Sequence, residues 1–392
     1  MKILIIWAES IERHTGGSVH FRGLVHGIKL NGWQVRAIVP AYGRGKISDV
    51  EDISFVSLPP RCLFSFLLLQ MATVLCMPYW LLRYRPEAVY VRACFLAFLM
   101  RLICRLARVP LIVEVDAIVD EEAEMRGQQR VLIAMLKILC KLNCRFVSAI
   151  VCVTKGLREE IIRRGAKPKT TVVIHNGSRT DVMQPIDQHQ ARQQLGLVEN
   201  GYIVGFTGTF APWQGLDLLI QAAREIVDNA KQTVRFILVG EGQFQKRLEE
   251  MVEQLGLGRF FSFLEPVLYK QVSIFNSACD VVVIPIYDPR KLRYGLSPLK
   301  FWDAISVGVP VLVPEGCQLE DVLQQLDLPG VFRAGDKKHL AETILGVLAR
   351  TEHHLSRRKD VHQMVAEQYS WKRVAERLLE LCAQVGTRMR RQ

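Results

Sequence analysis

The segment Ser297–Val311 carries residue types and spacings that suit the chemistry of phosphates and hydroxyls. Lys300 and Asp303 stand three residues apart, and side chains at that spacing share one face of a helix. The lysine offers a cation for phosphate oxygens, and the carboxylate accepts hydrogen bonds from sugar or ribose hydroxyls. A helix that begins here also adds free backbone N–H groups and the positive end of its dipole. The segment predicts a nucleotide-sugar site, although alone it is also typical of a capped helix before a strand.

A glycine pair near the start of the chain is a second candidate for phosphate chemistry. Gly16 and Gly17 lie in a predicted turn between the apolar run Ile3–Trp7 and the helical stretch Val19–Leu30. Because glycine has no Cβ, the backbone at this pair can approach a phosphate closely. The same pair is also compatible with an ordinary tight turn.

Glu241 is a candidate acceptor for ribose hydroxyls. It follows the apolar run Arg235–Val239, at the carboxyl edge of a predicted parallel sheet, where doubly wound folds bind their ligands. An exposed acid in a turn is the alternative interpretation.

Apolar strand-like runs alternate with helical stretches in both halves of the chain, which predicts two doubly wound parallel sheets in an α/β protein. The expected strands of the first half are Ile3–Trp7, Gln34–Val39, Ala88–Val91, Leu111–Val115 and Ala149–Val153. Those of the second half are Tyr202–Phe206, Arg235–Val239, Phe260–Phe263, Asp280–Pro285 and Val309–Val313.

The polar stretch Asp181–Asn200 is the expected linker between two domains. We therefore expect an N-terminal domain over residues 1–190, a C-terminal domain over 191–368 and a final helical segment over 369–392. A length of 392 residues suits two domains of ordinary size.

The positive charge is distributed unevenly along the chain. The net charge is +12, and residues 1–180 contain 26 Lys+Arg against 14 Asp+Glu, whereas the remainder contains 25 of each. The first half is therefore expected to face something anionic, either nucleic acid or a membrane surface. The basic residues fall as helix stripes without interleaved aromatic residues, which argues against nucleic acid.

Three segments of the first half have membrane character. Cys62–Leu82 is 21 residues without a formal charge, but a spanning helix there would disrupt the predicted sheet. Basic stripes on apolar helices are typical of helices that lie on anionic lipid, with a solvated outer face as the alternative. The two stripes are Arg101, Arg105 and Arg108, and then Arg130, Lys137, Lys141 and Arg145.

The cysteines and histidines predict no metal site. Ten cysteines contain no CxxC pair, and nine histidines contain no HxxxH pair. The chain begins directly with strand-like sequence, so we expect a cytoplasmic protein in a reducing compartment.

An ordered set of motifs resembles the retaining glycosyltransferases of the family-4 type, the glycosyl transferases group 1. The resemblance covers nearly the whole chain. Besides the glycine pair and Ser297–Val311, it rests on Glu114–Asp116, Val153–Gly165, Ile174–Ser178, Gly208–Ala222, Leu238–Gly242 and Cys279–Pro285.

The resemblance implies two Rossmann-like domains that face each other across a cleft, with a C-terminal helix crossing back onto the N-terminal domain. It implies a retaining, metal-independent hexosyltransferase without a cofactor, with a UDP- or GDP-sugar as donor and a lipid-linked or glycan acceptor. Lys300, Asp303 and Asp116 would be the catalytic residues. The implied donor-binding residues are Gly16, Gly17, Thr209, Gln214, Glu241, Arg293, Ser297, Pro298 and Leu299. The expected location is the cytoplasm, at the inner face of the plasma membrane.

Three positions depart from the family pattern. Thr209 and Gln214 stand where many members carry an arginine and a lysine, and Gly295 stands where an acid is usual. Arg293 or the Gly16–Gly17 amides are candidates to replace the missing cations. Asp116 stands in place of a frequent histidine, and it either orients the sugar or caps a loop. A catalytically inactive subunit or scaffold, and a nucleotide-sugar epimerase, are the alternative functions.

Overall fold

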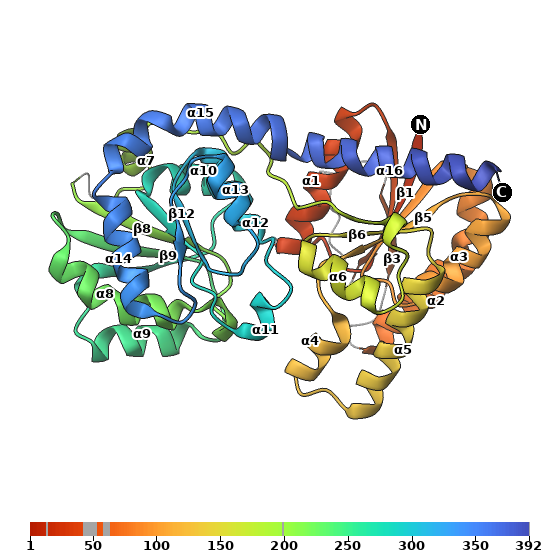
Figure 1. The fold of residues 1–392 in the computed structure, drawn as a ribbon, viewed down its shortest axis with the longest axis horizontal. Coiled ribbons are helices and arrows are strands. Elements are labelled where there is room, and N and C mark those ends of the chain that lie inside the picture. Colours follow the sequence, from red (N-terminus) through yellow and green to blue (C-terminus); the bar gives the residue numbers. More distant parts are fainter. Residues whose placement is uncertain (13–14, 42–52, 58–62, 198–199, 392) are drawn as a thin grey trace. The chain divides into compact units, whose positions relative to one another are not determined.

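The structure is a computed structural model that describes residues 1–12, 15–41, 53–57, 63–197 and 200–391. Contacts divide the chain into two compact units (Figure 1). Unit 1 is Met1–Asn176 with Trp371–Gln392, and unit 2 is Gly177–Ser370. Each unit is built around its own parallel sheet, so the predicted fold class of two Rossmann-like domains is confirmed.

The described part of unit 1 contains a seven-stranded sheet in the order β3-β2-β1-β4-β5-β6-β7. Its strands are β1 (Lys2–Trp7), β2 (Gln34–Ala41), β3 (Ile53–Ser57), β4 (Ala88–Arg92), β5 (Leu111–Val115), β6 (Ala149–Cys152) and β7 (Thr171–Val173). The strand order reverses at β1, which pairs with both β2 and β4. Doubly wound sheets bind ligands at such a point, beyond the carboxyl ends of the strands.

The helices of unit 1 flank this sheet. They are α1 (Gly16–Leu30), α2 (Leu63–Tyr84), α3 (Ala97–Leu106), α4 (Val119–Met125), α5 (Arg130–Phe146), α6 (Lys155–Arg163) and α16 (Trp371–Arg391). Helix α1 begins earlier than predicted, because Thr15 and Ser18 form a capping box in which each side chain accepts the other's backbone N–H. Gly16 and Gly17 therefore lie in the first turn of the helix and not in a turn before it.

The C-terminal helix α16 packs along α1. A Cβ at Gly23 would overlap the Trp371 indole, and one at Gly27 would overlap the Trp371 carbonyl oxygen. The two glycines thus let the helices approach closely. The predicted segment 369–392 differs slightly, because Tyr369 ends helix α15 (Thr351–Tyr369) and Ser370 separates it from α16.

Unit 2 has a six-stranded sheet in its described part, in the order β10-β9-β8-β11-β12-β13. The strands are β8 (Tyr202–Thr207), β9 (Val234–Val239), β10 (Phe261–Leu264), β11 (Val281–Val283), β12 (Val311–Pro314) and β13 (Val331–Phe332). The longer helices are α7 (Gln188–Gln194), α8 (Leu216–Asn229), α9 (Gln245–Gln254), α10 (Tyr269–Ala278), α12 (Leu299–Val307), α14 (Lys337–Leu348) and α15, with the short α11 (Pro289–Leu292) and α13 (Glu320–Gln325). This strand order is that of the Rossmann fold.

Both faces of the unit 2 sheet are buried. Along β9, Phe236 and Leu238 enter one apolar cluster and Ile237 and Val239 the other. Successive residues of a strand point to opposite faces, so a strand covered on both sides must be apolar throughout. That requirement explains why these strands were recognisable as continuous apolar runs.

The boundary between the units differs from the prediction. It falls after Asn176 and not at residue 190, because Ser178 donates its backbone N–H to the Tyr369 carbonyl at 3.0 Å, within unit 2. The expected linker Asp181–Asn200 also contains helix α7. Its Arg192 side chain is buried and pairs with Asp280 at 2.7 Å.

The three segments with predicted membrane character form the helices α2, α3 and α5. Within the described ranges, no helix combines the length and the apolar composition needed to cross a membrane. Helix α2 covers most of the uncharged run, and Cys62 at its start lies outside the described residues. Helix α3 ends at Leu106, so Arg108 is not part of its basic stripe. Arg108 lies in a left-handed backbone conformation with φ 56°, which ends a helix.

Candidate active site

The carboxyl ends of β8 and β9 carry two loops that pair through their backbones. The Gly208 N–H donates to the Val239 carbonyl at 3.0 Å, and the Phe210 N–H donates to the Glu241 carbonyl at 2.8 Å. The loops therefore form one layer at the ligand-binding edge of the unit 2 sheet. The side chains of Thr209 and Glu241 are exposed there.

Lys300 extends from the first turn of α12 to this layer. Its Nζ donates to Gln214 Oε1 at 2.8 Å and lies 3.8 Å from the centre of the Phe206 ring. Gly208 leaves room for the ammonium, because a Cβ there would lie 2.9 Å from Nζ, and its φ of 136° also favours glycine. Lys300 is partly buried, and this loss of hydration lowers its pKa from 10.5 to about 7.

Asp303 lies on the same helix but has different partners. Its side chain is buried, with 5% exposed, and Oδ1 accepts hydrogen bonds from the Tyr269 hydroxyl at 2.8 Å and the Ser178 hydroxyl at 3.1 Å. Burial raises the pKa of Asp303 to about 7, although the two hydrogen bonds oppose the shift. The predicted pair is thus arranged as a cation at the loop layer and a hydrogen-bonded acid beside it.

The other predicted donor-binding residues of unit 2 surround the start of α12. Pro298 is the N-cap residue and Leu299 the first residue of the helix. The Ser297 hydroxyl accepts the Trp302 indole N–H at 3.1 Å, which fixes the entry to the helix. Arg293 is exposed, with its guanidinium 5.1 Å from the centre of the Tyr294 ring.

Gly295 occupies a position that an acid cannot fill without strain. Its φ is +78°, and a Cβ there would lie 2.6 Å from Gln318 Oε1. The local backbone therefore favours glycine at position 295, where the family pattern has an acid.

In unit 1, Arg92 connects the polar residues that follow β1 and β5. It is the last residue of β4, and it forms ion pairs with Asp116 and, at 3.0 Å, with Glu9. Burial opposes its positive charge, but the surrounding carboxylates outweigh burial and raise the pKa of Arg92. A Cβ at Gly17 would overlap the Glu9 carboxylate. The group that approaches this glycine is therefore a side chain of unit 1 itself, where we expected a phosphate.

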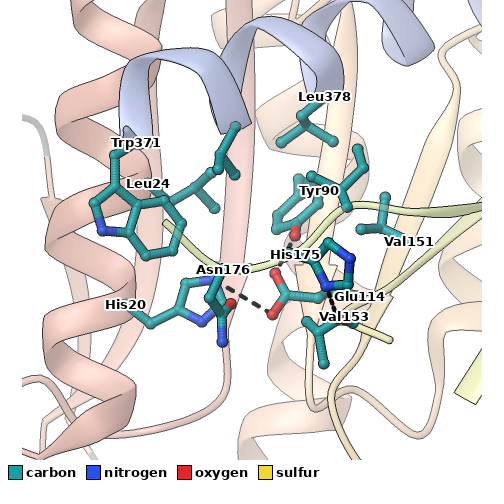
Figure 2. Close-up of a pocket in the computed structure, with 12 residues that line it drawn as sticks. His20, Leu24, Tyr90, Glu114, Val151, Val153, His175, Asn176, Trp371 and Leu378 are labelled. Carbon is teal, nitrogen blue, oxygen red and sulfur yellow. Dashed lines mark hydrogen bonds and ion pairs between the residues drawn. The ribbon is translucent and has the colours of Figure 1, made fainter. Parts of the chain in front are cut away.

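Glu114 lies between the side chains of His20 and Tyr90 and interacts with both (Figure 2). It lies 3.3 Å from the Arg92 Nε and 3.4 Å from the His20 Nε2, and it accepts the Tyr90 hydroxyl. Burial alone would raise the pKa of Glu114, but His20, Arg92 and the Tyr90 hydrogen bond together hold it at about 2. The adjoining cavity has a volume of about 10 Å³, which is enough for one water at most. Glu114 contacts Arg92, which in turn pairs with Asp116, so Glu114 helps to fix the position of Arg92.

Two family matches together cover both units. Residues 187–364 match the family described as Glycosyl transferases group 1, and residues 15–177 match the Glycosyl transferase 4-like domain. The chain belongs to the group 1 glycosyltransferases.

The individual relatives of the chain are distant. The chain is 29% identical to a D-inositol 3-phosphate glycosyltransferase of Geodermatophilus obscurus, over 57% of this chain and 49% of that relative. The match thus spans about half the length of the relative. An uncharacterized glycosyltransferase of Methanocaldococcus jannaschii is 24% identical over 83% of both chains. Among solved structures, Anabaena Alr3699/HepE in complex with UDP and glucose has a TM-score of 0.74 at 20% identity, covering 98% of this chain and 100% of that one.

Several residues around the candidate sites of the two units were not predicted from the sequence. Glu9 and Arg92 stand at the carboxyl ends of β1 and β4, so a search for polar residues directly after apolar runs would have found them. Tyr269 and Ser178 contact Asp303 across 34 and 125 residues of sequence. We find no local signal that would have predicted either contact.

Proposed function

We propose that this glycosyltransferase is a retaining, metal-independent hexosyltransferase. It would transfer a sugar from a UDP- or GDP-sugar to a lipid-linked or glycan acceptor, as a peripheral protein at the cytoplasmic face of the plasma membrane. The UDP and glucose bound to the Anabaena protein support the nucleotide-sugar donor. Unit 2 would bind the donor and unit 1 the acceptor.

The position of Lys300 carries this proposal. Its Nζ contacts Gln214 and adjoins Gly208, in the loop where the family pattern places the phosphate cations that this chain lacks. In the proposed reaction, cleavage of the sugar–phosphate bond leaves negative charge on the diphosphate. A fixed ammonium stabilises that charge more strongly in the transition state than in the ground state. In this proposal Lys300 would supply a cation to the loop from α12, in addition to the candidates Arg293 and the Gly16–Gly17 amides, which argues against an inactive scaffold.

The other donor contacts that we propose in unit 2 lie at the same ligand-binding edge of its sheet. Asp303 would accept a donor hydroxyl, with Tyr269 and Ser178 fixing the orientation of its carboxyl group. Glu241 is exposed on the adjoining loop and available for a ribose hydroxyl, and Arg293 is a second candidate cation for the diphosphate. In unit 1, Asp116 would orient the sugar, with its own position set by Arg92.

The charge of the two units favours a membrane-associated acceptor. Unit 1 contains 31 Lys+Arg against 16 Asp+Glu, whereas unit 2 contains 20 against 23. The difference in net charge between the units is larger than that between the two parts of the sequence divided at residue 180, because the basic C-terminal helix belongs to unit 1. A net positive surface attracts anionic lipid.

Exposed apolar rows accompany this charge. Helix α2 exposes large apolar side chains at a spacing of three or four residues, namely Leu67, Met71, Leu75, Tyr79 and Leu82. Helix α3 packs against α2 and exposes Leu102 and Leu106 beside Arg105. Apolar rows bordered by arginine are typical of helices that lie in a membrane interface.

The test is a screen of nucleotide sugars for thermal stabilisation and turnover with the full-length protein. A donor present at a hundredfold over its Kd should stabilise the fold by about 2.7 kcal/mol. NMR of the product should show an anomeric configuration equal to that of the donor sugar. Product with the opposite configuration would overturn the retaining mechanism. Conversion of the nucleotide sugar without transfer would favour the epimerase, and binding without any turnover would favour the scaffold.

A further inference from the structure

Unit 1 contains a cavity of about 760 Å³ between the carboxyl ends of its strands and the helices α4 and α5. This volume lies within the range of small-molecule binding sites. In Figure 1, α4 and α5 extend away from the sheet below β5 and β6.

The lining of the cavity changes from polar to apolar. Glu9 and Asp116 line its more exposed part, beside the carboxyl ends of β1 and β5. Its buried part is lined mainly by apolar side chains, including Leu136, Cys144, Ile150 and Ile161. Glu114 is the buried exception, and it pairs with His20 and accepts the Tyr90 hydroxyl.

Hydrogen bonds and ion pairs fix the walls of the cavity. The Asn143 side chain on α5 donates to the Cys94 and Phe95 carbonyls at 3.1 and 3.2 Å, and its oxygen accepts the Phe98 N–H at 2.9 Å. On the other side, Asp120 of α4 pairs with Arg164 at 2.6 Å. A space held open by such contacts cannot collapse without breaking them, so it is a built feature of the fold.

Helix α5 presents different faces to the cavity and to the surface. Leu132, Leu136, Cys140 and Cys144 line the cavity at intervals of four residues. The opposite side exposes Val131, Met135 and Ile138, which are 80%, 48% and 60% exposed. Basic residues flank this exposed row, namely Arg130, Lys137, Lys141 and Arg145. The helix is therefore apolar toward the cavity and suited to an anionic lipid surface on its outer side.

We propose that this cavity binds the hydrocarbon chain of a membrane-derived acceptor. The apolar part would hold the chain, and the polar end of the acceptor would lie beside Glu9, Arg92 and Asp116. The basic residues of α5 do not line the cavity, and they would instead hold this helix on the anionic membrane surface that supplies the acceptor. This inference rests on the proposed function, and it narrows the acceptor from a lipid or a glycan to a molecule with a chain.

Calorimetry with n-alkyl phosphates of increasing chain length, each below its critical micelle concentration, tests the proposal on the full-length protein. Burial of each further methylene should tighten binding about fourfold, until the cavity is filled. Affinity that is independent of chain length would overturn the proposal.

A matched pair of variants on α5 locates the binding. Leu132→Trp places an indole in the cavity, and the expected result is at least a tenfold loss of affinity for the longest chain bound by the wild type. Val131→Trp adds the same side chain at the neighbouring exposed position and should leave that affinity unchanged. An equal loss of affinity in both variants, or no loss in either, would contradict the assignment of chain binding to this cavity.

Thiol alkylation provides a measurement that does not depend on any variant. Cys140 lines the cavity, whereas Cys76 is exposed on α2. A long-chain alkyl phosphate should slow the modification of Cys140 several-fold relative to that of Cys76, and an unchanged ratio would count against chain binding.

Donor hydrolysis in water, measured in parallel, decides the proposed function separately because it needs no acceptor. Loss of chain binding with donor hydrolysis intact would remove only this inference. Chain binding without any donor turnover would leave the cavity assigned and remove the proposed transferase activity.

Discussion

The ammonium nitrogen of Lys300 lies 2.8 Å from the side-chain oxygen of Gln214, which stands where the family pattern has a lysine. The two positions are 86 residues apart, in the first turn of α12 and in the loop after β8. The positive charge of the loop is thus supplied by another element of the same sheet edge. Gln214 serves as its hydrogen-bond acceptor.

Exchange of these two residues should preserve a cation at the loop. Lys300→Gln alone removes the charge and should lower kcat/KM by about 10²–10³. The double variant Gln214→Lys/Lys300→Gln places an ammonium and an amide at the same contact and should recover part of that loss. Steady-state kinetics of both variants check this, and no recovery in a folded double variant would mean that the position of Nζ, and not only its charge, is required.

Donor binding should weaken as the pH rises above 7. Lys300 has a pKa of about 7 in the unliganded protein, and a bound diphosphate favours its charged form, so binding takes up a proton above that pH. The affinity should fall by up to about tenfold per pH unit. In Lys300→Arg the guanidinium stays charged throughout, so the slope should disappear. Calorimetry in buffers of different ionisation enthalpy measures the proton uptake directly, and a pH-independent wild type would contradict the assignment.

Lys300→Met should stabilise the unliganded protein. The folded-state pKa of Lys300 is lowered from 10.5 to about 7, so the unfolded state binds more protons between these values. The contribution of Lys300 to the free energy of unfolding therefore rises with pH between about 7 and 10.5. Below pH 7 the destabilisation caused by burying the charged ammonium is fully present. At pH 6 to 7 the Tm of Lys300→Met should exceed that of the wild type, and at pH 10 the two should converge. A lower Tm for the variant at pH 7 would show that Lys300 stabilises the fold.

Asp303→Asn should separate donor binding from folding. Because the folded-state pKa of Asp303 is raised from 3.8 to about 7, its contribution to stability falls as the pH rises between these values. The amide keeps an acceptor for Tyr269 and Ser178 and removes the buried charge, so Tm at pH 8 should not fall. Donor affinity should weaken by about 1–3 kcal/mol if the carboxylate accepts a donor hydroxyl. Calorimetry showing unchanged affinity would reduce Asp303 to a structural residue.

Vesicles that contain anionic lipid should bind the protein, less tightly at high salt. Arg101 contacts Met389 at 3.8 Å, which places the basic end of α16 beside α3. Replacing Arg101, Arg105, Arg388, Arg390 and Arg391 by Gln should weaken binding by up to about 1 kcal/mol per charge.

Replacing Arg224, Arg247 and Arg259 of unit 2 by Gln is the control and should have little effect, because these exposed residues lie outside the positively charged unit. Equal effects of the two sets would indicate nonspecific electrostatics. Alkaline carbonate should release the native protein from membranes, and resistance to it would contradict peripheral association.

The buried strands were the most predictable part of the fold. Leu111–Val115 has the predicted bounds, and Gln34–Val39 differs from β2 by two residues, because strands buried on both faces are apolar throughout. The least accurate predictions concerned polar segments between the strands. Helix α7 was hidden in a linker-like sequence because its packing depends on a buried arginine that pairs with distant Asp280.

The sequence pointed to Lys300 and Asp303 as candidate site residues, but it did not predict which side chains contact them. Lys300 and Asp303 were found from their spacing on one helix, which is a local property. Their separate partners, Gln214 and Tyr269, come from other segments of unit 2, which only the tertiary fold brings together. The close contact between Gly17 and the Glu9 side chain depends on tertiary structure, and the predicted contact of Gly16 and Gly17 with a phosphate stays a prediction.

The turnover of Lys300→Ala tests the central claim most directly. Lys359→Ala removes an exposed lysine from the middle of α15 and serves as the control. With the nucleotide sugar identified by screening, Lys300→Ala should lower kcat/KM by about 10²–10³ while remaining folded, because the leaving diphosphate loses its cation. The control should match the wild type. Turnover of Lys300→Ala close to that of the wild type would contradict the assignment of the donor site to this helix.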